Sequence, residues 1–204
     1  MLCLLQFFEG VEHGVVLFHG LAEAESGIED PVPDALILGP GREVPVPCQD
    51  IRSIFGRAVV KKLETYGIEM TEHVTVDDGL ENIRAAIDEM RRTDVELILC
   101  TGGMSVDPDD NTPGAIRQSG ARIVTYGAPV LPGAMFLLGY YDDGMPVMGL
   151  PGCVMYAKAT VFDLALPRIA AGVEMTRDDF VDMGEGGLCL GCGQCRYPVC
   201  PFGK

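Results

Sequence analysis

The stretch VELILCTGGMSVDPDDNTPGAI, residues 95–116, decides the fold class of this chain. Its first six residues form an apolar run typical of a buried strand, and Gly102 and Gly103 follow directly after Thr101. Three aspartates fall in the loop, and a threonine followed by Pro113 then starts a helix. A strand that leads through such a loop into a helix is typical of an α/β sheet, and these loops often carry function.

The same alternation continues over most of the chain. Apolar runs predict strands, and apolar residues at helical spacing predict helices. The expected strands are 34–39, 68–76, 95–100, 121–127 and a hairpin over 135–150, and the stretch HGVVLFHG at 13–20 is compatible with a further strand. The expected helices are 51–66, 80–90, a segment from Thr112 and 153–171. This order predicts a three-layer α/β/α domain with a mainly parallel sheet over residues 34–174. Residues 1–33 form an N-terminal segment that the pattern leaves undefined, and residues 175–204 form a Cys-rich tail.

The composition argues against several kinds of partner. The chain has 204 residues, 48% of them hydrophobic, as expected for a globular protein. Its formal net charge of -15 disfavours nucleic acid and anionic membranes, since both require clustered basic side chains. The uncharged stretch 123–141 is broken by prolines and glycines, and no basic leader precedes the apolar first residues. We expect a cytoplasmic protein without a membrane span, and we also expect a homo-oligomer.

Three glycine-bearing loops follow expected strands of the sheet. They are GPGREV at 39–44, TGGMSVDPDDNTP at 101–113 and LPGC at 150–153. In open α/β sheets, ligands bind beyond the carboxyl ends of the strands. We therefore expect the three loops to converge on one crevice.

The glycine loop carries the strongest candidate residues. Gly102 and Gly103 can expose backbone N–H groups that cradle a phosphate, or they can simply form a tight strand-to-helix turn. Asp110 lies two residues before the helix, where a carboxylate can hold Mg²⁺. Asp107 and Asp109 are interpreted as solvated loop charges.

Other candidates have weaker individual signals. Glu43 follows a glycine-rich turn at a strand end, and Ser105 can donate to a phosphate. Asp77 or Asp78 is expected to cap the helix 80–90, which is the commonest role of aspartate at that position. Gly152 lies just before the helix expected at 153–171, where free N–H groups can bind an anion.

Taken in order, these motifs resemble the molybdopterin-binding domain shared by molybdopterin adenylyltransferases and molybdenum insertases. The matching segments are GREV at 41–44, VDD at 76–78, the TGG loop, the Pro132–Gly133 turn and GLPG at 149–152. Asp110 falls on the functional aspartate of that family. The chain departs from the family at Arg42, where Asp or Asn is usual, and at Cys153–Val154, where Asn-Pro is usual.

The resemblance implies a ligand class and several alternative functions. The first is a molybdopterin-binding protein that acts in molybdenum cofactor biosynthesis or delivery. The alternatives are a Mg²⁺-dependent molybdopterin adenylyltransferase or molybdenum insertase, and a metal-bearing accessory protein whose crevice is vestigial. Implied ligands and partners are the pterin, Mg²⁺, an adenine nucleotide and a molybdenum enzyme. The implied catalytic residues are Asp110, Asp77 and Asp78, and the implied cofactor-binding residues are Glu43, Gly102, Gly103, Ser105, Asp110, Pro132, Gly133, Pro151 and Gly152.

The tail CLGCGQCRYPVCPFGK has the spacing C-x₂-C-x₂-C-x₄-C-P. Four thiolates at this density suit tetrahedral zinc or an iron–sulfur cluster. The alternative is a flexible tail with reactive thiols. We expect one metal centre bound by Cys189, Cys192, Cys195 and Cys200. We also expect the residues after about Gly187 to become disordered without metal, since the sequence offers the tail almost no core of its own.

Overall fold

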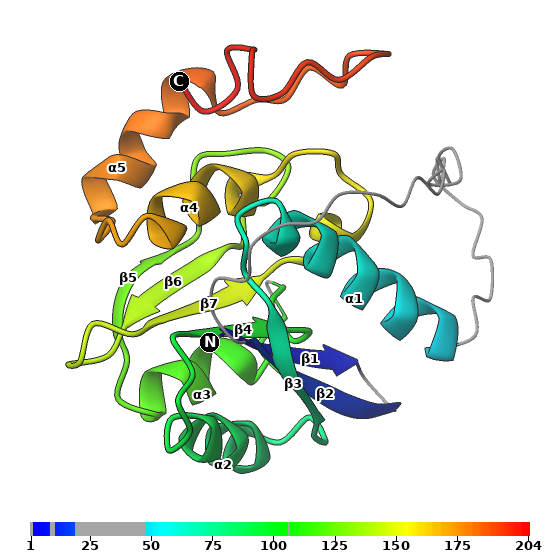
Figure 1. The fold of residues 1–204 in the computed structure, drawn as a ribbon, viewed down its shortest axis with the longest axis vertical. Coiled ribbons are helices and arrows are strands. Elements are labelled where there is room, and N and C mark those ends of the chain that lie inside the picture. The colour runs from blue at the N-terminus through cyan, green and yellow to red at the C-terminus, as the bar shows by residue number, and fades with distance from the viewer. Residues whose placement is uncertain (1, 9–10, 19–47, 106) are drawn as a thin grey trace.

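The computed structural model describes residues 2–8, 11–18, 48–105 and 107–204. Its helices and strands are shown in Figure 1. In chain order they are β1 (Leu2–Phe8), β2 (Val11–Phe18), α1 (Cys48–Glu64), β3 (Met70–Thr75), α2 (Leu80–Met90), β4 (Leu97–Thr101), α3 (Thr112–Gln118), β5 (Arg122–Tyr126), β6 (Leu137–Tyr140), β7 (Pro146–Leu150), η1 (Gly152–Met155), α4 (Val161–Ala170), α5 (Arg177–Asp182) and η2 (Met183–Gly186). The strand expected at 34–39 lies outside the described residues.

The strands form one seven-stranded sheet in the order β3-β2-β1-β4-β7-β6-β5. The α/β class is confirmed, but the sheet is mixed rather than mainly parallel. Among the described strands, only β1, β4 and β7 pair in parallel, and the other four pairings are antiparallel. The physical reason is connection length, because β2 follows β1 and β7 follows β6 after short links, which can join only antiparallel strands.

Alternating side chains of β4 divide the core between the two faces of the sheet. Leu97 and Leu99 belong to one buried cluster, which includes residues of α1 and α4. Ile98 and Cys100 belong to the other, which includes residues of α2 and α3. Figure 1 shows these helix pairs on opposite sides of the sheet. The predicted three layers are therefore present, and β4 is buried on both faces.

The helix ends differ in detail from the expectations. Gly67 adopts φ 68° just after α1, as predicted for its end. The N-cap of α2 is Gly79, so the expectation that Asp77 or Asp78 caps this helix is wrong. The N–H of Gly79 instead bonds the backbone carbonyl of Asp77 at 2.7 Å. The N-cap of α3 is Asn111, one residue earlier than the sequence suggests.

The long helix expected at 153–171 is divided into η1 and α4. The first segment ends at Met155, and Thr160 starts the second, because its N–H and hydroxyl donate to Asp163 Oδ2 at 2.7 and 2.9 Å. Pro167 lies within α4 and has no N–H to offer the carbonyl of Asp163 four residues earlier. The hydroxyl of Tyr197 donates to that carbonyl at 2.7 Å, so the tail supplies the missing bond. Burial raises the pKa of Tyr197 to about 12, which keeps this donor protonated at neutral pH.

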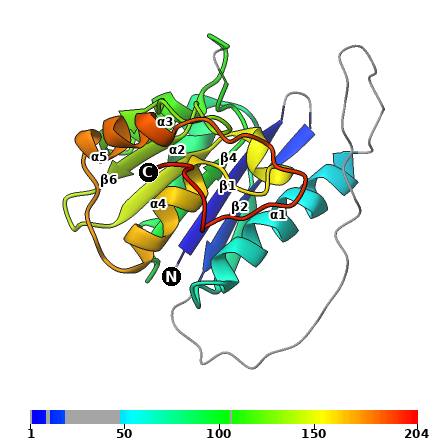
Figure 2. The ribbon, with the colours of Figure 1, turned by 90° about the horizontal axis from the view of Figure 1, so that it is seen from above.

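The Cys-rich tail is joined to the domain at both ends. The N–H of Leu131 donates to the carbonyl of Gly187 at 2.6 Å, and the N–H of Cys189 donates to the carbonyl of Leu131 at 2.8 Å. Near the C-terminus, Phe202 is only 4% exposed and belongs to the same buried cluster as α1 and α4. Figure 2 shows the tail lying across α4. The tail therefore packs against the core of the domain, and the expectation that it becomes disordered without metal stays a prediction.

Candidate functional site

Four strands end along one edge of the sheet. The β-strand register places Thr75, Gly14, Gln6, Thr101 and Leu150 in a single row across β3, β2, β1, β4 and β7. Of these strands, β1, β3, β4 and β7 run in the same direction. β3, β4 and β7 end at this row, and β1 ends just beyond it at Phe8. The loops that follow β3, β4 and β7 therefore start side by side at the carboxyl edge, which is the usual ligand edge of such sheets.

We define the glycine loop as residues 102–111, which connect β4 to α3. Gly102 and Gly103 have φ values of 87° and 51°, a left-handed conformation that favours glycine. The hydroxyl of Thr112 donates to the carbonyl of Gly102 at 2.9 Å. A Cβ at position 103 would lie 2.9 Å from that same hydroxyl oxygen. The glycine pair is therefore required by the turn itself.

The carboxylate of Asp110 folds the glycine loop back on itself. It accepts the backbone N–H of Ser105, and the N–H of Asp110 donates to the carbonyl of Asp107 at 3.1 Å. The hydroxyl of Tyr126 in β5 donates to the carbonyl of Ser105 at 2.9 Å. Burial, and secondarily the charge of Asp110, raise the pKa of Tyr126. Asp110 thus has a loop-forming role that the sequence did not reveal.

The buried side chain of Met104 attaches the glycine loop to the next strand. Met104 is 5% exposed, and a Cβ built on Gly149 of β7 would collide with its sulfur and terminal methyl group. The missing side chain at position 149 therefore makes room for Met104. This contact fixes the loop against the strand whose end carries the LPGC turn.

Two buried side-chain oxygens at this edge have no hydrogen-bond partner among the described residues. They are Oγ1 of Thr101, whose side chain is fully buried, and Oδ1 of Asp78. Thr71 Oγ1 and Arg84 Nε are the other two such atoms. Buried polar atoms are nearly always satisfied, so unpaired oxygens beside the glycine loop are positions where a ligand can supply the partner.

The segment with Asp77 and Asp78 lies beside the helix that follows the glycine loop. A Cβ built on Gly114 in the first turn of α3 would lie 3.3 Å from Cδ1 of Leu80, the first residue of α2. The two helix starts are thus in contact. This packing places Asp77 and Asp78 on the same side of the molecule as Asp110.

The Pro132–Gly133 turn also lies at this edge. It comes shortly before β6, whose first residue, Leu137, pairs with Gly149 near the end of β7. Its contacts are structural. The carbonyl of Pro132 accepts the N–H of Val161 at 3.2 Å, and a Cβ at Gly133, whose φ is 113°, would approach Val161 Cγ1 to 2.8 Å. The turn therefore fits closely against the start of α4.

The Pro151–Gly152 turn leads into η1 and brings Cys153 beside a buried ion pair. Lys62 Nζ lies 2.6 Å from Asp163 Oδ2 and donates to the carbonyl of Ala157 at 3.4 Å. Burial raises the pKa of Cys153, and the charge of Lys62 only partly opposes this effect. The thiol is therefore protonated at neutral pH and is not an activated nucleophile.

The sequence reasoning did not identify Lys62, Asp163, Thr101 or Tyr126 as site residues. Two signals were present. Asp163 is the only acidic residue in the stretch 153–171, and Lys62 occupies an apolar position of helix α1. A lone acid and a lone base at buried positions of two helices predict an ion pair between them.

Some predicted features lie elsewhere or are not formed. Glu43 and the whole GREV segment fall outside the described residues. The other two loops start side by side, at Thr101 and Leu150, and their expected convergence on one crevice stays a prediction. A cavity of 720 Å³ opens at the opposite, amino edge of the sheet, and its lining includes Leu97, Arg122 and Pro146. It contains none of the predicted site residues. The carboxyl edge therefore remains the candidate site, because the predicted loops and the unpaired buried oxygens are there.

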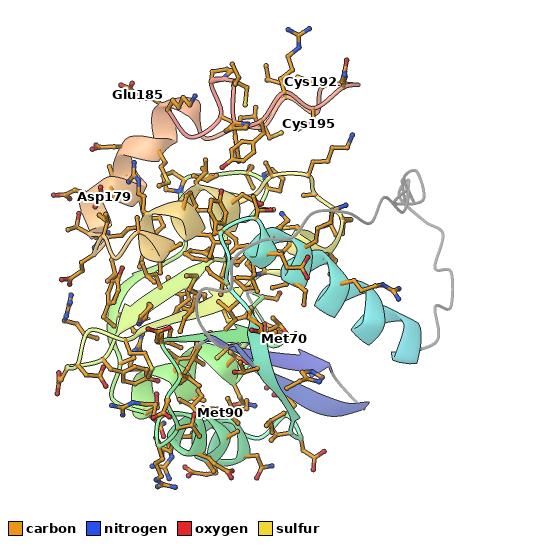
Figure 3. The ribbon with its side chains drawn as sticks, in the orientation of Figure 1. Met70, Met90, Asp179, Glu185, Cys192 and Cys195 are labelled. Carbon is orange, nitrogen blue, oxygen red and sulfur yellow. The ribbon has the colours of Figure 1, made fainter. Side chains whose placement is uncertain are left out.

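The structure does not assemble a metal centre in the part of the chain that it describes. No three His, Cys, Asp or Glu side chains there are grouped closely enough to hold a metal ion. Cys189 and Cys200 are partly buried, whereas Cys192 and Cys195 are exposed on the outer part of the tail (Figure 3).

The described helices also include none that is long and apolar enough to cross a membrane.

Comparison with known proteins identifies one family. The family described as a probable molybdopterin binding domain matches residues 38–171, which is more than half of the chain. The matched range covers α1 to α4 and contains the glycine loop, the Pro132–Gly133 turn and the LPGC turn. No curated protein matches the chain at a significant level.

Proposed function

Because the chain belongs to the molybdopterin-binding domain family, we propose that its carboxyl edge binds a molybdopterin-type pterin in molybdenum cofactor biosynthesis or delivery. The observation that supports this proposal most directly is the construction of the glycine loop. Its backbone is held by Asp110, Thr112 and Tyr126 before any ligand arrives. A loop that is already ordered loses little further entropy when it binds a ligand.

The glycine loop offers donors suited to the phosphate of such a ligand. The N–H groups of Gly103 and Met104 bond no described residue, so they are available to an anion. Ser105 is exposed and can add its hydroxyl. The unpaired oxygen of Thr101 can accept a bond from the pterin ring or from its substituents. Backbone donors are needed here because the net charge of -15 would otherwise repel a phosphate.

The finer assignments are part of the same proposal. In the binding function, the protein carries the cofactor to a molybdenum enzyme. In the enzymatic alternative, Mg²⁺ held by Asp110 with Asp77 or Asp78, and with Glu43, would neutralise the phosphates of an adenine nucleotide. Cys153 in place of the family's asparagine favours the binding function, since its protonated thiol cannot replace an amide as a hydrogen-bonding group. A homo-oligomeric cytoplasmic protein is the form that we propose.

The test compares two neighbouring aspartates of the glycine loop. Asp110→Ala removes the acceptor that bonds the N–H of Ser105, whereas Asp109→Ala removes an exposed carboxylate that bonds no described residue and serves as the matched control. We expect Asp110→Ala to lower the affinity for molybdopterin by about tenfold or more. The substitution removes the charge-assisted bond from the N–H of Ser105, and such a bond contributes ~1.5–3 kcal/mol. The affinity is measured by calorimetry under exclusion of oxygen.

Unchanged affinity in Asp110→Ala, with a folded protein by circular dichroism, would contradict the proposed role of this loop. Wild-type protein that does not bind the pterin at all would contradict the proposed function itself. Release of pyrophosphate from Mg-ATP in the presence of molybdopterin would decide for the enzymatic alternative.

A further inference from the structure

We propose that the thiol loop, residues 189–200, binds one metal centre through four thiolates. The centre is a zinc ion or a single iron–sulfur cluster, which share thiolate coordination. This inference concerns the tail alone and does not depend on pterin binding. The four ligands are Cys189, Cys192, Cys195 and Cys200.

Two of the four ligands are already fixed on the domain. Cys189 and Cys200 are partly buried, and both pack against the core cluster of α1 and α4. The N–H of Cys189 bonds the carbonyl of Leu131 at 2.8 Å. Two residues after Cys200, Phe202 is buried in the core and holds that end in place. Folding of the domain therefore already orders two of the four ligands. Metal binding then loses less conformational entropy.

The part of the loop between these fixed ends has no bonds that would keep it in its present position. Residues 190–195 form no hydrogen bond with any described residue. A Cβ built on Gly191 or Gly193 would meet nothing within 4 Å. Such a segment can be displaced at small cost in free energy, so Cys192 and Cys195 can swing toward the fixed pair. This closure is required, because the four thiols are not grouped in the structure.

Closure also provides partners for the free backbone donors of the loop. The N–H groups of residues 190–195 have no acceptor in the described protein, and thiolate sulfurs of a metal centre accept such bonds. The exposed side chains of Leu190 and Val199, at 75% and 83%, can then cover the centre. A hydrophobic cover limits solvent access to the metal.

The local charge favours a site of this kind. Residues 186–204 contain no aspartate or glutamate, although the whole chain has a net charge of -15. They contain Arg196 and Lys204, and Lys204 Nζ is held near the loop by a 3.0 Å bond to the carbonyl of Pro198. Four thiolates around a dication leave an excess of negative charge, which these two cations offset.

The experiment measures metal in the full chain purified without oxygen. We expect either about one zinc per chain with no visible absorbance, or iron with equimolar sulfide and a broad brown absorbance. Protein stripped of metal is then titrated with Co²⁺ as a zinc probe, and separately with ferrous iron plus sulfide. If the site is of the zinc type, bound Co²⁺ should give the visible absorption bands of tetrahedral thiolate coordination. Binding should also release protons from the thiols.

Single Cys→Ser variants identify the ligands. Cys192→Ser and Cys195→Ser alter exposed residues, so the domain should stay folded. Metal affinity should fall by more than about 100-fold, beyond the loss caused by removing an outer-shell partner. Cys153→Ser, a partly buried cysteine outside the tail, is the matched control and should keep its metal. No metal in the isolated protein and none taken up in either titration would overturn the proposal. So would a stable Cys192–Cys195 disulfide, found by mass spectrometry, that persists in anaerobic protein.

Discussion

The glycine loop and the thiol loop are both rich in glycine and in metal-binding side chains, yet their structures are opposite. The glycine loop is fixed by bonds from Asp110, Thr112 and Tyr126 and by the buried Met104. Within the described part of the chain, the thiol loop is fixed at its ends, and residues 190–195 form no hydrogen bond with the domain. The comparison teaches that glycine at a ligand loop can serve either of two purposes. It can permit a tight, ordered turn, or it can leave the chain free to close around a ligand.

The largest expected effect separates these two purposes of glycine. Gly149→Val should force Met104 out of its site and detach the glycine loop from β7. We expect the free energy of unfolding to fall by about 2–3 kcal/mol, as for other over-packed cores. Gly193→Val in the thiol loop is the matched control, because a Cβ there meets nothing within 4 Å. Urea denaturation followed by circular dichroism measures both values.

An equal loss of stability in Gly149→Val and Gly193→Val would show that the two loops are equally fixed. That result would contradict the close contacts at Gly149 and the open space at Gly193. A smaller effect at Gly149 would mean that Met104 repacks easily. Hydrogen exchange at Ser105 checks this directly, since its N–H is protected by Asp110 only while the loop is closed.

A second, intermediate effect tests the fixed end of the thiol loop. Tyr197→Phe removes the hydroxyl that bonds the carbonyl of Asp163, which Pro167 leaves without a helical donor. We expect a loss of about 1–2 kcal/mol in the free energy of unfolding, the cost of an unsatisfied, mostly buried carbonyl. The double variant with Pro167→Ala supplies an N–H at position 167 and should recover part of the loss. No difference between the single and double variants would contradict this explanation.

The smallest effect is expected from lengthening the thiol loop. Inserting two glycines after Gly193 should change the free energy of unfolding of metal-free protein by less than about 0.5 kcal/mol, because loop-closure entropy grows slowly with length. The same insertion after Pro108 separates Asp110 from Ser105 and should cost ~1 kcal/mol or more. Thermal denaturation of the two insertion variants provides the comparison. A larger cost at Gly193 than at Pro108 would reverse the assignment of the ordered and free loops.

Much of the fold followed from local patterns. The apolar run before Thr101 predicted β4, the helical spacing predicted α1 and α2, and Gly67 marked the end of α1. The sheet direction was harder to predict. The hairpin of β6 and β7 was predicted, but the antiparallel pairing of β2 with β3 was not, because β3 lies far from β2 in the chain and such pairing leaves no local periodicity.

The candidate site was predicted in part. The adjacent starts of the glycine loop and the Pro151–Gly152 turn followed from their positions after parallel strands, which β4 and β7 confirm. The loop-forming bond of Asp110 to Ser105 was not predicted, since an aspartate near a helix start has several local uses. The ion pair of Lys62 with Asp163 joins positions 101 residues apart and required the packed helices.

The sequence by itself determined which segments become strands, helices and glycine turns, and it determined the family and its ligand class. These properties depend on residues close together in the chain: apolar spacing, left-handed glycines and motif order. Only the tertiary structure decided which oxygens at the carboxyl edge stay unpaired, as at Thr101, and how the tail is held. Tyr197 finds the carbonyl that Pro167 frees only after α4 and the tail have packed together. Hydrogen-bond satisfaction in a protein interior is set by neighbours in space, which a linear pattern does not contain.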